Sequence, residues 1–218
     1  MITNRFLEKT EKLWNDFNNH PFVKGIADGS LDKNKFKHYI IQDTLYLRDY
    51  ARAFLIGAAK ANDMETMSFL ATSGCNMVNS QDDVNKRYMR KMELTLEEIY
   101  NTPLSLDNLS YVSYMIQVAY EGGSAEALAA IMPCALSYEA IAKHMIANNP
   151  KCVDDSFYGD FISNYARQAF HENNERMISL INNLSKDYDE IRKEKLIEIF
   201  VRSSEYEMLF WDLSWNLK

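Results

Sequence analysis

Residues 124–148 read SAEALAAIMPCALSYEAIAKHMIAN and contain the longest uninterrupted apolar run of the chain, residues 127–136. An apolar segment of this length, starting directly after a Gly-Gly turn, predicts a buried core helix. Pro133 lies inside that helix, where proline removes the hydrogen bond to the carbonyl of Ala129 and crowds it. Because kinks of this kind often lie beside functional groups, the next residue, Cys134, is a candidate site residue.

Cys134 allows two interpretations. If the helix continues through Pro133, Cys134 and Tyr138 share a face, because residues four apart are neighbours on a helix. The thiol would then be a nucleophile with a hydroxyl group beside it. Buried free cysteines are, however, mostly inert core residues, and a reactive cysteine usually needs a lowered pKa. The local sequence leaves both interpretations open.

The rest of the chain also has the pattern of helices. Seven glycines and four prolines are few for 218 residues, and apolar residues recur every three to four positions. Proline disfavours a helical residue before it, so Pro21 ends the first helix, and Asp32 can cap a long one. We predict helices at about 4–17, 21–26, 33–61, 64–92, 95–100, 107–120, 124–148, 155–184 and from 186 to the end. The predicted fold is all-α, a single-domain helical bundle over residues 1–218.

The bulk composition narrows the functional classes. The net charge is −7 and the chain has no basic cluster, which argues against nucleic acid as a partner. Its three cysteines are far apart and form no CxxC pair, so neither a disulfide framework nor a zinc site is expected. The N-terminal residues lack the apolar stretch of a signal peptide, and the ten-residue apolar run is too short to cross a bilayer. We therefore expect a soluble cytoplasmic protein with no membrane partner.

Asp43 is the single charge on one apolar face of the predicted helix 33–61. Burial of an unpaired carboxylate is costly, so this side chain needs a partner or a ligand. A paired core aspartate and a ligand-binding aspartate both satisfy that need. Tyr46 lies close to the same face and could direct its hydroxyl to the same place. The other residues of the face are Phe36, Ile40, Leu47, Tyr50 and Phe54.

Glu207 repeats the pattern in the last predicted helix, where it shares a face with Phe200, Phe210 and Trp211. An aromatic environment should raise the pKa of its carboxyl group, which suits a proton donor near neutral pH. A buried structural glutamate remains the alternative. Glu205 is a weaker candidate, because Arg202 lies three residues before it and favours a surface ion pair.

Tyrosines add polar groups to the predicted interior, whereas no metal-binding pattern is present. Tyr111, Tyr138 and Tyr165 lie on predicted helices with inward-facing positions, although most tyrosines are simply packing residues. None of the four histidines follows a glutamate at the Glu-x-x-His spacing of di-iron bundles, so no metal is expected. The residues by themselves thus indicate an all-α protein with a polar pocket formed by a cysteine and two acids.

In chain order these elements resemble the TenA-type thiaminase II family, the aminopyrimidine aminohydrolases with a haem-oxygenase-like fold. The resemblance spans nearly the whole chain. Leu136 and Ala166 depart from the family's commoner residues, which are a tryptophan and a glycine. The matching segments are residues 20–23 (HPFV), 25–29 (GIADG), 36–39 (FKHY), 42–43 (QD) with 46–47 (YL), 133–134 (PC) with Tyr138, and within 203–211 the pairs 203–204 (SS), 206–207 (YE) and 210–211 (FW).

The resemblance implies a role for each candidate residue. Cys134 would add to an electron-poor carbon of an aminopyrimidine ring, while Glu207 protonates the ring nitrogen. Asp43 would accept hydrogen bonds from the exocyclic amine and orient the ring. The implied binding residues around them are Tyr46 and Tyr165 near the cysteine, Tyr111 and Phe210 on the two faces of the ring, and Tyr138 on the pocket wall.

The implied reaction is hydrolysis of an aminomethyl pyrimidine, formed when thiamin degrades, to the hydroxymethyl pyrimidine and ammonia. The same site would also cleave thiamin itself, and both reactions belong to thiamin salvage. No metal or organic cofactor is needed, and family members are commonly homotetramers. Two other classes stay open: a different haem-oxygenase-like enzyme, such as a metal-dependent oxygenase, and a non-catalytic helical regulatory protein.

Overall fold

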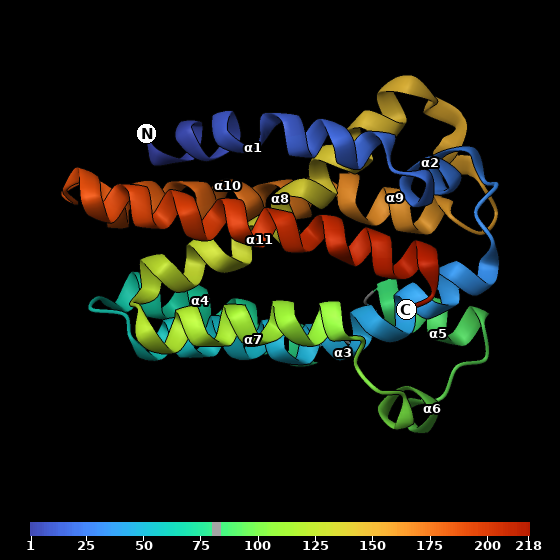
Figure 1. Ribbon diagram of the computed structural model, residues 1–218, viewed down its shortest axis with the longest axis horizontal. Coiled ribbons are helices and arrows are strands. Elements are labelled where there is room, and N and C mark those ends of the chain that lie inside the picture. The colour runs from blue at the N-terminus through green and yellow to red at the C-terminus, as the bar shows by residue number, and fades with distance from the viewer. Residues whose placement is uncertain (80–83) are drawn as a thin grey trace.

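The computed structural model describes residues 1–79 and 84–218, which form helices joined by short turns, with no strand in those ranges. The predicted all-α bundle is therefore confirmed. The elements, shown in Figure 1, are α1 (Ile2–Asn19), α2 (Pro21–Asp28), α3 (Lys33–Ala59), α4 (Met64–Asn79), α5 (Val84–Lys91), α6 (Leu96–Asn101), α7 (Leu106–Glu121), α8 (Ser124–Asn148), the 3₁₀ helix η1 (Pro150–Asp154), α9 (Gly159–Ala166), α10 (Gln168–Ser185) and α11 (Glu190–Asn216).

Helix α8 is the central element of the bundle. It begins and ends at the predicted residues, continues through Pro133, and packs against α1, α3, α7, α9, α10 and α11. In Figure 1, α1 and α7 lie on opposite sides of the bundle and α8 crosses between them. Every residue from Ser124 to Pro133 is buried. A helix that is apolar on all sides needs partners all around it, and the other helices supply them.

The length and composition of α8 would also suit a membrane span, which the ten-residue run did not predict. Among the helices of the described residues, only α8 is long and apolar enough for such a span, and 83% of its most apolar segment is buried inside the protein. Burial of this extent is typical of a core helix.

Several predicted helix ends are confirmed by capping contacts. The Asp32 carboxylate accepts a hydrogen bond from the backbone N–H of Asn34, which starts α3. Thr95 and Glu98 form a reciprocal capping box at the start of α6. The helix predicted over residues 64–92 corresponds to α4 and α5, and its residues 80–83 lie outside the described part of the chain.

The single helix predicted over residues 155–184 is wrong. The Asp155 carboxylate accepts hydrogen bonds from the backbone N–H groups of Phe157 (2.8 Å) and Tyr158 (2.6 Å), forming a turn that competes with helix, so α9 starts only at Gly159. A second break occurs at Arg167, whose backbone is extended and separates α9 from α10. The last helix likewise starts later than predicted, because Asp189 caps the N–H of Arg192.

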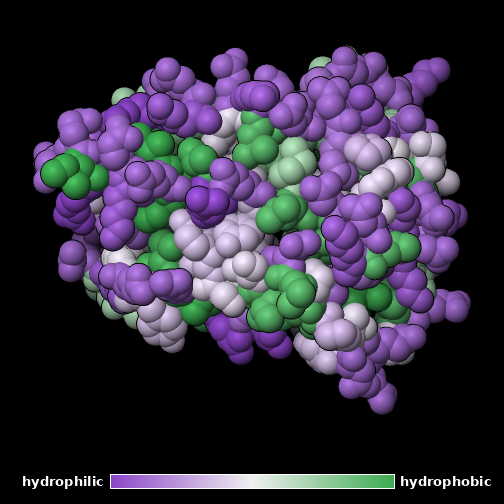
Figure 2. Space-filling model, in the orientation of Figure 1, coloured by the Kyte–Doolittle hydropathy of each residue, from purple (hydrophilic) through white to green (hydrophobic). Residues whose placement is uncertain are grey.

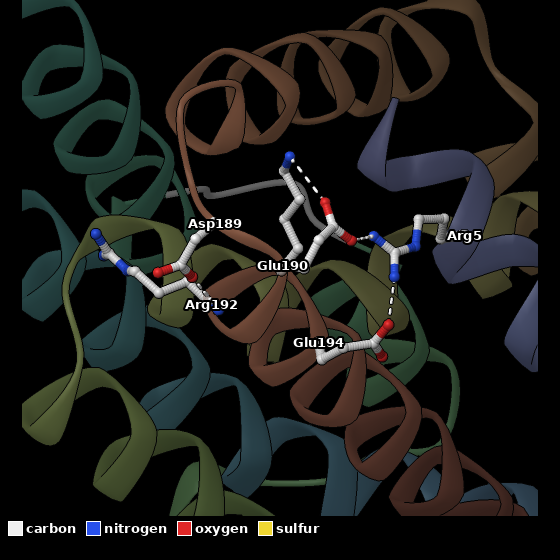
Figure 3. Close-up of polar contacts among 6 residues, drawn as sticks. Arg5, Asp189, Glu190, Arg192 and Glu194 are labelled. Atoms are coloured by element: carbon white, nitrogen blue, oxygen red, sulfur yellow. Dashed lines mark hydrogen bonds and ion pairs between the residues drawn. The ribbon is translucent and has the colours of Figure 1, made fainter.

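The first and last helices of the chain, α1 and α11, pack on each other. Figure 3 shows the Arg5 guanidinium between the carboxylates of Glu190 and Glu194, with a 3.0 Å hydrogen bond to Glu190. Surface ion pairs contribute only about 0–1 kcal/mol. Beneath them the rings of Phe6 and Phe200 stack with centroids 4.5 Å apart, and both side chains are fully buried. Apolar packing therefore provides most of the stability of this contact.

Hydrophilic residues cover most of the face drawn in Figure 2, with smaller hydrophobic areas between them. That surface agrees with the 25% of charged residues in the chain. The chemically informative groups lie underneath, inside the bundle.

Gly159 is needed where α9 approaches η1, because a Cβ there would lie 2.2 Å from the carbonyl oxygen of Val153. We expect Gly159→Ala to lower the free energy of unfolding by about 2 kcal/mol or more, since backbone atoms must move. Gly123→Ala is the matched control, as its Cβ would meet nothing closer than 3.4 Å. Urea unfolding of both variants measures the difference, and equal losses would contradict the steric argument.

Candidate active site

The predicted site residues come from five helices and lie in the interior of the bundle. Asp43 and Glu207 are 5% and 2% exposed, so both carboxyl groups are buried. Cys134 and Tyr165 are partly buried, and the other members are buried. The contributing helices are α3 with Asp43 and Tyr46, α7 with Tyr111, α8 with Cys134 and Tyr138, α9 with Tyr165, and α11 with Glu207 and Phe210.

Glu207 is held by the Tyr111 hydroxyl, which donates a 2.7 Å hydrogen bond to its Oε1. Burial raises the pKa of the Glu207 carboxyl to about 8, and the nearby negative charge of Asp43 adds to the rise. Hydrogen bonds from Tyr111 and the Cys134 thiol oppose it. The direction agrees with the prediction from its aromatic surroundings. At neutral pH Glu207 is mainly a neutral acid that can donate a proton.

The Cys134 thiol has the opposite property to the one expected of a reactive cysteine. Burial raises its pKa well above the ordinary value, and the charges of Glu207 and Asp43 raise it further. Hydrogen bonds from Tyr46 and Tyr50 oppose this effect without overcoming it. Cys134 is therefore a thiol in the free protein at neutral pH, and its proton must leave as the sulfur reacts.

Helix α8 places Tyr138 one turn after Cys134, on the same side. The Tyr39 hydroxyl donates to the Tyr138 hydroxyl at 3.1 Å. The ring of Tyr138 lies 4.9 Å from that of Tyr165 and 5.0 Å from that of Trp211, between centroids. The cluster joins α9 to α8, since Tyr165 belongs to α9 and Tyr138 to α8.

Tyr46 joins the aromatic residues of three helices. Its ring centroid lies 5.2 Å from that of Tyr111 and 5.7 Å from that of Phe210, and its hydroxyl donates to the Met115 sulfur at 3.6 Å. Aromatic side chains at these separations favour stacked or edge-to-face contacts. Such surroundings are suited to a flat, aromatic ligand.

The site includes residues that the sequence did not single out. The Asn85 side chain of α5 donates to Asp43 Oδ2 at 2.6 Å. The Tyr50 hydroxyl donates to the carbonyl of Ile131 at 2.9 Å, and its proximity to Cys134 partly offsets the rise in the pKa of that thiol. Tyr50 was on the same predicted face as Asp43, so its position was a usable signal. Asn85 had no signal, because its contact depends on how α5 packs against α3.

Within residues 1–79 and 84–218, no group of three or more His, Cys, Asp or Glu side chains is arranged to hold a metal ion. Two histidines instead contact acids near the surface. His20 lies 3.3 Å from Asp212, and His171 lies 2.7 Å from Glu139, measured between a ring nitrogen and a carboxylate oxygen.

Known proteins are similar to this chain over nearly its full length. The model of the TENA/THI-4/PQQC family matches residues 7–217. The chain belongs to this family. An aminopyrimidine aminohydrolase from Helicobacter pylori is 34% identical to it over 215 residues, which are 99% of each chain. Another from Halalkalibacterium halodurans is 37% identical over 96% of this chain and 93% of its own.

Solved structures of the TENA/THI-4/PQQC type have the same fold. A TenA homologue from P. horikoshii superimposes with a TM-score of 0.90 at 27% identity, covering 99% of both chains. A domain of unknown function with a haem-oxygenase-like fold, from Shewanella denitrificans, reaches 0.76 at 11% identity over 98% of this chain and 92% of its own. The predicted haem-oxygenase-like architecture is thereby confirmed.

The raised pKa of Glu207 makes stability depend on pH. The pKa of Glu207 is about 8 in the folded protein and about 4.3 in the unfolded chain. Its contribution to the free energy of unfolding is therefore complete below about pH 4.3 and is lost as the pH rises towards 8. Glutamine cannot titrate, so Glu207→Gln does not lose this contribution. Its free energy of unfolding should therefore increase relative to that of the wild type as the pH rises from about 4.3 towards 8. Urea unfolding at a series of pH values measures it.

The exposed Glu205 on the same helix provides the control for that experiment, since it pairs with Arg202 at 2.7 Å on the surface. Glu205→Gln should follow the wild-type curve. A constant difference between Glu207→Gln and the wild type from pH 5 to 8 would show that Glu207 is not a buried neutral acid.

Proposed function

We propose that the protein is an aminopyrimidine aminohydrolase of thiamin salvage that uses Cys134 as its nucleophile. The observation that carries this proposal is the meeting of a thiol, a neutral carboxylic acid and a buried carboxylate among aromatic rings. The relatives named aminopyrimidine aminohydrolase, similar over nearly the full chain, support it. The substrate is 4-amino-5-aminomethyl-2-methylpyrimidine and the products are its 5-hydroxymethyl counterpart and ammonia.

The first step adds the Cys134 S–H across a ring C=N bond. The sulfur bonds to the carbon, Glu207 gives its proton to the ring nitrogen, and the thiol proton replaces it on Glu207. Loss of aromaticity makes this addition costly, and simultaneous protonation of the nitrogen reduces the cost. The raised pKa values of both groups favour this order, because neither carries a charge before the step.

The second half of the reaction exchanges the substituent. Electrons from the ring nitrogen expel the side-chain amine as ammonia, which takes up a proton, and leave an exocyclic methylene group on the ring. Water adds to that carbon as hydroxide, and its other proton is released. The departing cysteine sulfur then takes the proton that Glu207 holds, and the ring nitrogen gives its own proton to Glu207. This restores the aromatic ring, the Cys134 thiol and the neutral Glu207 acid.

The remaining site residues bind and orient the ring in this proposal. Asp43 accepts hydrogen bonds from the exocyclic amine and the adjoining ring nitrogen. Tyr46 and Tyr165 hydrogen bond near the sulfur, as does Tyr50. Tyr111 and Phe210 take the two faces of the ring, and Tyr138 forms the pocket wall. Their buried, aromatic surroundings support these roles.

Thiamin is the second proposed substrate, with its thiazole alcohol as the leaving group in place of ammonia. No cofactor takes part in either reaction as written. We also propose that residues 1–218 form one catalytic domain, which acts in the cytoplasm as a homotetramer. The match of the family model to residues 7–217 supports the single domain.

Removal of the thiol tests the mechanism. Cys134→Ala should reduce kcat for the aminomethyl pyrimidine by about 1,000-fold or more, since the proposed adduct forms through its sulfur. Ammonia release is measured with the aminomethyl pyrimidine, and thiazole release with thiamin, in parallel assays. Cys152→Ala, at a buried cysteine in η1, is the control and should keep wild-type activity. Full hydrolysis by Cys134→Ala would refute the nucleophile, and an inactive wild type would refute the function.

Substrate orientation is tested at Asp43. Asp43→Ala should weaken binding of the hydroxymethyl pyrimidine product by about 10- to 100-fold, because hydrogen bonds to a charged group are lost. Asp49→Ala is the matched control, since Asp49 lies on the same helix but pairs with Arg48 and Arg52. Titration calorimetry gives both affinities. Unchanged affinity in Asp43→Ala would refute its binding role.

A further inference from the structure

Asn85 is a buried amide that lies against the carboxylate of Asp43. It is 2% exposed and belongs to the first turn of α5, a short helix rich in polar residues. Its Nδ2 donates to Asp43 Oδ2 at 2.6 Å and lies 3.4 Å from the hydroxyl of Thr44. The first contact has the short length typical of hydrogen bonds to charged groups.

This contact restricts the carboxylate. The terminal torsion of an aspartate has a broad energy minimum, so the plane of an unrestrained carboxylate is poorly fixed. A rigid amide donor on Oδ2 selects one plane and occupies one acceptor direction of that oxygen. Asn85 therefore helps to fix the plane in which Asp43 presents its carboxylate to a ligand.

Asn85 is also a costly way to fill this part of the core. Its Oδ1 is buried and has no hydrogen-bond partner among the described residues. An unsatisfied buried acceptor destabilises the fold, whereas an apolar side chain of similar shape does not. A residue whose only task was packing would be better replaced by leucine, so the benefit of the amide lies in its contact with Asp43.

We propose that Asn85 is a positioning residue, which holds the Asp43 carboxylate in the plane that receives the N–H groups of the aminopyrimidine. This inference rests on the proposed function. It extends the binding site to α5, a helix that contributes none of the residues predicted from the sequence. Asn85 acts through Asp43 and does not itself react.

A matched pair of variants tests the proposal. Asn174 of α10 resembles Asn85 in three respects: it is buried, its Nδ2 donates to a carboxylate oxygen of Glu139 at 2.6 Å, and its Oδ1 has no partner among the described residues. It also donates to the carbonyl of Ala135 at 3.2 Å and has no contact with Asp43 among the hydrogen bonds of the described residues. Asn85→Leu and Asn174→Leu each remove a buried amide from a carboxylate. Steady-state kinetics with the aminomethyl pyrimidine and thermal unfolding are measured for both.

We expect Asn85→Leu to raise KM about 10-fold or more and to leave kcat within about 3-fold of the wild type. Asn174→Leu should lower the melting temperature but leave KM unchanged. Asn85→Gln keeps an amide donor, so it should recover part of the KM loss, and it provides the test if the leucine variant does not fold.

Three results would overturn the inference. A wild-type KM in Asn85→Leu would show that the amide is not needed for orientation. Equal KM increases in Asn85→Leu and Asn174→Leu would indicate general loosening of the bundle. Absence of aminopyrimidine turnover in the wild type would remove the proposed function and this inference with it, and it is distinguished from the other two by the wild-type assay.

Discussion

The burial of two carboxyl groups and a thiol among aromatic rings is the constraint on which the chemistry of this bundle depends. Burial disfavours the charged forms of acids and thiols, so both Glu207 and Cys134 have raised pKa values. The Asp43 charge strengthens both shifts. The result is a site with a proton-donating acid and an un-ionised thiol at neutral pH, which is the combination that a concerted addition to an aromatic ring requires.

The helices around α8 maintain that environment. Because α8 is apolar on nearly all sides, α3, α7 and α11 must cover it, and each of them contributes a polar group to the interior. The same packing encloses the site in rings, with Tyr46 contacting both Tyr111 and Phe210. The stability of the bundle and the properties of the site therefore have one origin, the exclusion of water from its centre.

Local patterns predicted the bundle well because helix signals are short-range. The bounds of α8 and the caps at Asp32 and Thr95 follow from neighbouring residues. The helix predicted over 155–184 failed for a different reason: the Asp155 turn competes with helix, and the extended backbone of Arg167 separates α9 from α10. The spacing of apolar residues along the chain does not reveal either effect.

The sequence by itself determined the all-α class, the position of Cys134 in an apolar core helix, and the two acids on apolar faces, because each follows from spacing along one helix. Only the tertiary structure decided that these groups from α3, α8 and α11 meet, that Tyr111 donates to Glu207, and that Asn85 holds Asp43. The structure also decided the pKa direction of Cys134, which the sequence had left open: burial raises it. A pKa depends on the solvent excluded and the charges nearby, and distant segments supply both.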